Sequence, residues 1–144
     1  MKLMTMRLFC YLLVGGLIFS GKFVFGGDYN SKPTAVSFLL ILNNPNYKDK
    51  VIVTNEKIGK WTLPNNWFTM SAGYLAYKMV LHSDNLGEGM NVFTIKIRNN
   101  SKITVVVLSP TNDIFAQYNG PGNIKFSFNY DPDFNQVDNI KQWR

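Results

Sequence analysis

The sequence predicts an all-β protein: a single antiparallel β-sandwich, Ig-like or jelly-roll in style, that follows an N-terminal signal peptide. Three observations support this prediction. Apolar and polar residues alternate with a period of two in several short segments after residue 33. Clusters of Asn, Gly, Pro and Asp separate these segments. No stretch after residue 33 keeps the apolar spacing of a long helix.

The composition fits one domain with its own apolar core. The chain has 144 residues, of which 46% are hydrophobic, 15% aromatic and 17% charged. A chain of this length has room for one domain, and its apolar content excludes global disorder. Collagen-like, coiled-coil and polytopic membrane classes are excluded by the same composition.

The N-terminus has the pattern of an export signal. Lys2 and Arg7 precede an apolar stretch that runs from Leu8 to Ser20, and no acidic residue interrupts them. A basic start followed by an apolar stretch of this length is typical of a signal peptide. We therefore expect residues 1–26 to be a signal peptide.

Small residues place the expected cleavage after Ser20 or after Gly26. Residues 27–144 would then form the mature domain, secreted or periplasmic. The alternative is a leader that stays as a membrane anchor, although Lys22 interrupts its apolar run.

Removal of the leader changes both the thiol content and the charge of the protein. The only cysteine, Cys10, lies in the leader, so the mature chain is expected to be free of disulfides and of cysteine metal sites. The leader also carries three basic residues and no acid, which leaves twelve basic against nine acidic residues, a net charge of +3 instead of +6. Nucleic acid is therefore not an expected partner, because so small a charge gives little attraction for phosphates.

Six segments after the leader have the alternation of β-strands. They are Thr34–Leu42, Val51–Glu56, Tyr74–His82, Val92–Arg98, Lys102–Leu108 and Ile124–Tyr130. The first is apolar on both of its faces, so we expect both faces to be covered. The fourth and fifth are separated only by Asn99–Ser101 and are expected to form a β-hairpin.

The remaining segments are expected to be irregular. Gly59–Thr69 contains a Pro-Asn-Asn turn signal, and Pro110–Gly122 reads as a long loop. The tail from about Asp131 is expected to be loosely packed, either as a short helix over Phe134–Gln142 or against a sheet edge.

The inward positions of the six strands define an expected core. Its members are Phe38, Leu40, Val53, Leu75, Met79, Leu81, Phe93, Ile95, Ile97, Val105, Val107, Phe126 and Phe128.

Aromatic and Asn-rich loops supply the candidate binding residues. Exposed rings can stack on sugars, neighbouring amides can bond to hydroxyls, and the ends of sandwiches often carry binding loops. The candidates are Trp61, Asn65, Asn66, Trp67, Phe68, Tyr74, Phe115 and Tyr118. The same rings would also serve as plugs at the ends of the sandwich, or as contacts with a lipid interface.

No catalytic or metal-binding motif accompanies these residues. His82 stands beside Ser83 and Asp84, but neighbours on a strand point to opposite faces, so this trio cannot act as a relay. Asp131 and Asp133 lack a full set of calcium ligands. We expect no metal and no cofactor.

Basic residues around the expected hairpin, Lys96, Arg98 and Lys102, fit a solvated strand face or a protected edge.

The stretch from Ala35 to Trp61 resembles the opening of aegerolysin-type β-sandwiches, which bind membrane lipids. It has an apolar strand, an Asn turn, a Val/Ile strand and a Gly-Lys-Trp sequence. The resemblance implies a sandwich fold and a lipid ligand. It covers under a quarter of the chain, and the Cys- and Trp-rich later segment of that family has no counterpart here.

The sequence therefore predicts an exported, non-enzymatic binding module that contacts a glycan or a protein partner. The first alternative is a toxin-like sandwich that binds a membrane surface. The second is a small hydrolase that uses His82 with distant partners.

Overall fold

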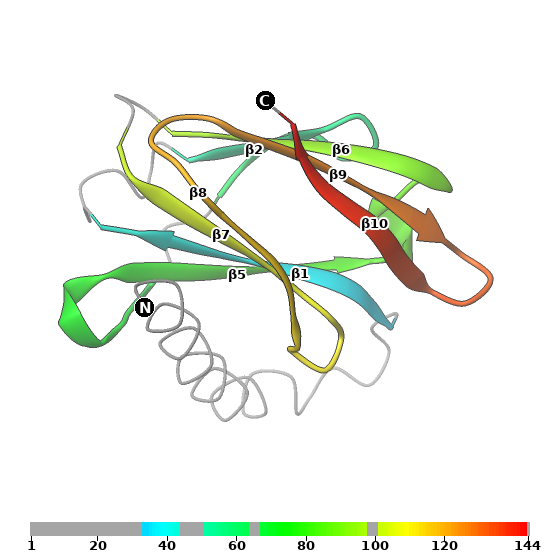
Figure 1. The fold of residues 1–144 in the computed structure, drawn as a ribbon, viewed down its shortest axis with the longest axis horizontal. Helices are drawn as coiled ribbons and strands as arrows, with labels where there is room; N and C mark the ends of the chain where they lie inside the picture. Colours follow the sequence, from blue (N-terminus) through cyan, green and yellow to red (C-terminus); the bar gives the residue numbers. More distant parts are fainter. Residues whose placement is uncertain (1–32, 44–50, 64–66, 98–100, 144) are drawn as a thin grey trace. The chain divides into compact units, whose positions relative to one another are not determined.

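Two five-stranded antiparallel sheets pack against each other in the computed structural model (Figure 1). The structure describes residues 33–43, 51–63, 67–97 and 101–143. The expected signal peptide, with Cys10, lies outside these residues. None of the helices in the described ranges has the length and hydropathy needed to cross a membrane.

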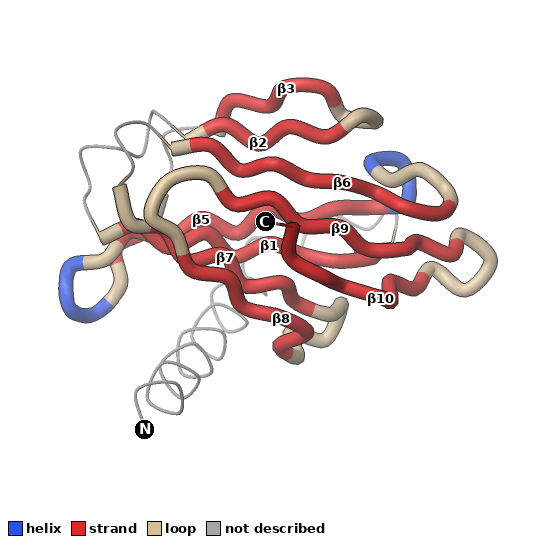
Figure 2. The backbone as a smooth tube through the Cα atoms, turned by 45° about the horizontal axis from the view of Figure 1, so that its top comes forward, coloured by secondary structure: helices blue, strands red, loops and turns tan. Residues whose placement is uncertain are grey.

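Sheet A has the strand order β4-β5-β1-β7-β8, and sheet B has the order β10-β9-β6-β2-β3 (Figure 2). The strands of sheet A are β1 (Thr34–Leu42), β4 (Phe68–Thr69), β5 (Leu75–His82), β7 (Ile103–Leu108) and β8 (Ile114–Asn119). Those of sheet B are β2 (Ile52–Asn55), β3 (Gly59–Thr62), β6 (Gly89–Lys96), β9 (Ile124–Asp131) and β10 (Gln136–Trp143). Two single-turn 3₁₀ helices, η2 (Ser71–Gly73) and η3 (Ser83–Asn85), flank β5.

The prediction of an all-β fold built from antiparallel strands is confirmed. All six predicted strands are present, and their ends agree with the prediction to within three residues. The central strand β1 is buried along both faces from Ala35 to Leu42, as its two-sided apolar pattern predicted. The two packed sheets give the fold the layering of a β-sandwich.

The core is an aromatic cluster that joins the two sheets. Phe38 of sheet A meets Phe93, Phe126 and Phe128 of sheet B edge-on, with ring centroids 4.8, 5.0 and 6.3 Å away. Phe93 in turn stacks on Phe126 and Phe128. All thirteen predicted core residues are buried. Alternation along the strands thus identified the interior correctly.

The predicted hairpin between the fourth and fifth strands is wrong. β6 pairs with β2 and β9 in sheet B, whereas β7 pairs with β1 and β8 in sheet A. The connection therefore crosses from one sheet to the other. Ile97 and Ile103 at its two ends are both buried in the core. Two strands have the same apolar alternation whether they pair in one sheet as a hairpin or lie in two different sheets. The sequence pattern therefore could not distinguish the two connections.

The predicted long loop contains a strand. Ile114–Asn119 forms β8, which pairs with β7 at the edge of sheet A. Most of its side chains are half-buried, and only Phe115 and Asn119 are exposed. An edge strand with one partner has little need of a strong apolar alternation, which explains why its sequence reads as a loop. The segment expected to be irregular at 59–69 likewise contains the short strands β3 and β4.

Of the two structures expected for the tail, the helix over Phe134–Gln142 is wrong, and the position at a sheet edge is the one observed. The tail forms β10, which pairs with β9 at the edge of sheet B. The register shifts between Asp138 and Lys141, and Asn139 adopts φ 52° there. This bulge lets Val137 and Ile140, three residues apart, both pack against the core. A spacing of three residues imitates a helix, which is the physical reason for the error.

Loss of the Phe38 ring should weaken the packing between the two sheets. We expect Phe38→Ala to lower the free energy of unfolding by about 3–5 kcal/mol, because the ring is fully buried and leaves a cavity between the sheets. Urea denaturation measures the change. Phe134→Ala, which removes an exposed ring, is the control and should change stability by about 0.5 kcal/mol or less. Equal losses in the two variants would contradict the role given to Phe38.

Candidate functional site

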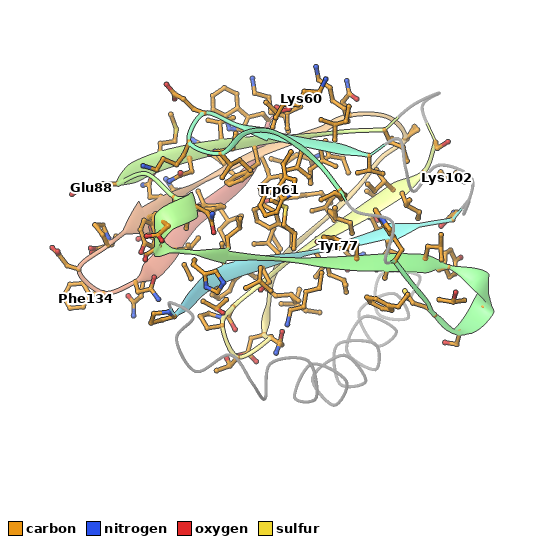
Figure 3. The ribbon with its side chains drawn as sticks, turned by 180° about the vertical axis from the view of Figure 1, so that it is seen from behind. Lys60, Trp61, Tyr77, Glu88, Lys102 and Phe134 are labelled. Atoms are coloured by element: carbon orange, nitrogen blue, oxygen red, sulfur yellow. The ribbon has the colours of Figure 1, made fainter. Side chains whose placement is uncertain are left out.

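The two tryptophans predicted to bind a ligand lie against the core. Trp61 on β3 and Trp67 before β4 are half-buried and pack on the apolar cluster. Figure 3 shows Trp61 and Tyr77 in the space between the two sheets. The Trp67 ring is 5.6 Å from Tyr77, and its buried Nε1 has no hydrogen-bond partner among the described residues. These rings therefore serve as packing at the rim of the core.

The rest of the predicted 61–77 surface is only partly described. Phe68 is half-buried on β4, where it pairs with Ala76. Tyr74 is half-buried just before β5. Asn65 and Asn66 lie outside the residues that the structure describes.

On β8, the two predicted site residues point in opposite directions. Tyr118 packs against the core, 5.4 Å from the Phe126 ring. Burial raises the pKa of the Tyr118 hydroxyl, which has no hydrogen-bond partner among the described residues. Phe115 is 45% exposed. Of the two, Phe115 is the one placed to meet a ligand.

The predicted site residues do not form one surface. β4 and β8 are the opposite edges of sheet A, with three strands between them. At a strand spacing of about 4.8 Å, these edges lie about 19 Å apart. The aromatic region from Trp61 to Tyr77 and the β8 region are therefore separate places on the molecule.

A cleft of about 380 Å³ opens beside Phe115, where β8 and β10 approach each other along the seam between the sheets. We call it the seam cleft. It is lined by Ala35, Pro110, Phe115, Phe134, Asn135, Gln136 and Val137. Phe134, in the β9–β10 turn (Figure 3), is 73% exposed. Two exposed phenyl rings beside two amide side chains give the cleft both an apolar surface and hydrogen-bonding groups.

The β9–β10 turn holds its wall of the seam cleft in place. The Tyr130 hydroxyl donates to Asn135 Oδ1 at 2.8 Å, and Asn135 Nδ2 donates to the Thr34 carbonyl at 3.3 Å. Asn135 adopts φ 50°, a left-handed conformation that Asn tolerates. The Asp133 amide donates to Asp131 Oδ1 at 2.9 Å, which closes the start of the turn.

Burial and nearby negative charge keep the Tyr130 hydroxyl protonated. Burial, and then the negative charges of Asp131 and Asp84, raise the pKa of Tyr130. The hydroxyl therefore keeps its proton at neutral pH and above it. The hydroxyl can therefore donate to Asn135 over the same range.

The opposite wall is held by the β7–β8 loop. Ser109 Oγ accepts from the amides of Thr111 and Asp113 at 3.2 and 2.9 Å, and Thr111 Oγ1 donates to Asp113 Oδ2 at 2.8 Å. Lys78 Nζ donates to Asn112 Oδ1 at 2.6 Å and ties the loop to β5. Burial lowers the pKa of Lys78. Both walls are thus fixed before a ligand arrives, which reduces the entropy lost on binding.

Among the described residues, the lone histidine makes no side-chain hydrogen bond of the kind that a catalytic relay needs. His82 ends β5, and its buried Nδ1 makes no hydrogen bond within the described part of the chain. Its amide donates to Asn85 Oδ1 at 2.9 Å, which closes the turn of η3. In the same part of the chain, no three His, Asp or Glu side chains gather closely enough to hold a metal ion.

Sequence reasoning missed the turn side of the cleft. Phe134 stands among turn-forming residues, Asp-Pro-Asp before it and Asn after it. A large apolar ring in such a turn is a signal of exposure, and it was hidden by the helix expected there. Pro110 and Gln136 carry no such signal on their own.

Comparisons with protein-family models, with curated proteins and with solved structures find no match to this chain. The resemblance of residues 35–61 to aegerolysin-type sandwiches stays an expectation from the sequence.

Removal of the Tyr118 hydroxyl, which has no hydrogen-bond partner among the described residues, should stabilise the protein. We expect Tyr118→Phe to raise the free energy of unfolding by about 1 kcal/mol at pH 8, because a buried hydroxyl without a partner costs free energy. Tyr118→Leu, which also removes the ring, should destabilise the fold instead.

Tyr118→Phe should also reduce the loss of the free energy of unfolding at alkaline pH. The pKa of Tyr118 is raised in the folded state, so the unfolded chain loses this proton first as the pH rises past about 10, and stability falls there. Tyr118→Phe removes this contribution. Urea unfolding at pH 8 and pH 11 tests it, and an equal loss between the two pH values in both proteins would contradict it.

Proposed function

We propose that this chain is an exported, non-enzymatic binding module whose seam cleft binds a glycan. The proposal keeps the fold as a single sandwich, Ig-like or jelly-roll in style, that follows a signal peptide. One observation supports it most: two exposed phenyl rings, Phe115 and Phe134, line one cleft whose walls are fixed by hydrogen bonds.

The chemistry of the seam cleft favours a sugar. Phenyl rings offer flat apolar faces for the C–H side of a pyranose, while the exposed amide of Gln136 is placed to bond to sugar hydroxyls. The cleft has the volume of a small-ligand site. A protein partner that inserts one side chain would use the same rings, and it is the competing outcome of the binding test.

Exposure of large rings also argues for a binding role. The ring of Phe134 is mostly exposed, so it keeps a large apolar surface in contact with water. The hydrogen bonds of its turn are made by other residues and do not require a ring at this position. A ring placed on a fixed turn is the arrangement expected of a contact residue.

Truncation of the rings should remove binding without harming the fold. We expect Phe134→Ala and Phe115→Ala each to weaken glycan binding by about tenfold or more, since a ring contact in a fixed site contributes about 1–2 kcal/mol. A glycan array followed by calorimetry on the best ligand measures this. Met90→Ala, which removes an exposed side chain on β6, is the control and should bind normally. Binding that survives loss of both rings would place the ligand elsewhere.

Export should leave a shortened chain. We expect expression in a secreting host to give a mature protein that begins at Gly21 or Gly27, because small residues precede both positions. N-terminal sequencing and intact mass decide between them. Recovery of the chain with Met1 in the membrane fraction would support the retained anchor instead.

A further inference from the structure

The outer face of sheet B carries one row of polar side chains across all five strands. Lys60 of β3 pairs with Thr54, Thr54 with Thr94, Thr94 with Lys125, and Lys125 with Trp143 of β10. Their inward neighbours Val53 and Phe126 are fully buried, so this row faces away from the core. We call it the lysine row.

Two further lysines flank the lysine row. Lys96 stands two residues from Thr94 on β6, and Lys141 pairs with Ser127 beside Lys125. All four lysines of this face are exposed, and Figure 3 shows Lys60 on the outer side of its sheet. Asp138, on the same face, pairs with Asn129, about 14 Å along β9 from Lys125. The four lysines therefore give this face an excess of positive charge around the lysine row.

The tryptophan at the end of the row is tied to β9. Trp143 Nε1 donates to Ser127 Oγ at 2.7 Å, and Lys125 Nζ lies 4.7 Å from the centre of its ring. The ring is thus anchored at its nitrogen by the neighbouring strand, and an ammonium group lies over one of its faces. That face is not available to stack on a nucleic-acid base.

We propose that the lysine row binds an acidic polysaccharide, a linear sugar chain with sulfate, phosphate or carboxylate groups. Lys60 and Lys125 are three strands apart, about 14 Å, so a chain laid across the strands meets them in succession. Lysine ammonium groups pair with anionic substituents as point charges. The hydroxyls of Thr54 and Thr94, between the two lysines, bond to the sugar hydroxyls.

This site is separate from the seam cleft. The row crosses the outer face of sheet B, whereas the cleft is lined by residues of β1, the β7–β8 loop, β8 and the β9–β10 segment. The inference therefore goes beyond the proposed function and does not depend on it. Two sites of different chemistry would let one domain bind a charged polymer and a neutral sugar at once.

Matched charge reversals test the proposal. We expect heparin, a sulfated polysaccharide, to bind the full chain and neutral dextran not to bind. Lys60→Glu should weaken heparin binding about tenfold or more, and Lys60→Glu/Lys96→Glu should abolish it. Lys102→Glu makes the same change in net charge at an exposed lysine before β7 and should alter binding by about twofold or less.

The salt dependence and two further arms complete the test. The logarithm of the heparin affinity should fall linearly with the logarithm of the salt concentration, with a shallower slope for Lys60→Glu. Phe134→Ala should bind heparin normally, which separates this site from the seam cleft. Equal losses in Lys60→Glu and Lys102→Glu, absence of heparin binding, or binding to phosphatidylserine vesicles without heparin binding would each overturn the proposal. Urea denaturation of each variant confirms that the fold is intact.

Discussion

The contact of Phe38 with three phenyl rings of the opposite sheet is the interaction on which the rest of the structure depends. The described residues contain no cysteine, so no disulfide joins the two sheets there. What holds the layers together is apolar burial, and Phe38 is the ring of sheet A that contacts all three phenyl rings of sheet B, whereas Tyr118 contacts Phe126. Edge-to-face rings have a preferred geometry, so this contact sets the spacing and the mutual orientation of the sheets as well as their adhesion.

Both binding regions follow from that spacing. The seam cleft exists because the sheets are held at a separation that brings the edges β8 and β10 near each other without joining them. The lysine row exists because the inward positions of sheet B are committed to the core, which leaves the alternate positions of the same strands facing water. Because side chains alternate along a strand, the same strands supply both the apolar face that packs in the core and the charged face that meets solvent.

The sequence correctly predicted which residues of each strand are buried, because burial follows a local periodicity. It did not predict which strands pair with each other. Phe93 and Ile95 were assigned to the interior because every second residue of their strand is apolar, and this signal is local. Whether β6 continues into a neighbour in its own sheet or crosses to the other sheet is decided by contacts far away in the chain, and no local pattern records it. The bulge at Asn139 gave a helical spacing to a strand. Of the two rings that line the seam cleft, Phe115 was among the candidates because of its loop-like sequence, whereas Phe134 was not, because its segment had a helical spacing.

The central strand β1 carries apolar side chains on both of its faces, and this has a consequence for how the chain folds. In most strands of a two-layer protein, a slip of one residue turns polar groups inward and is rejected at once. In β1 such a slip exchanges Phe38 and Leu40 for the apolar Leu39 and Ile41, and Ser37 is the one polar side chain that it turns inward between Ala35 and Leu42, so polarity offers little protection against the mistake. Shape offers more, because the slipped strand has no phenyl ring to enter the aromatic stack. Transient misaligned forms of this protein should therefore concentrate at β1, and the ring of Phe38 is what makes them short-lived.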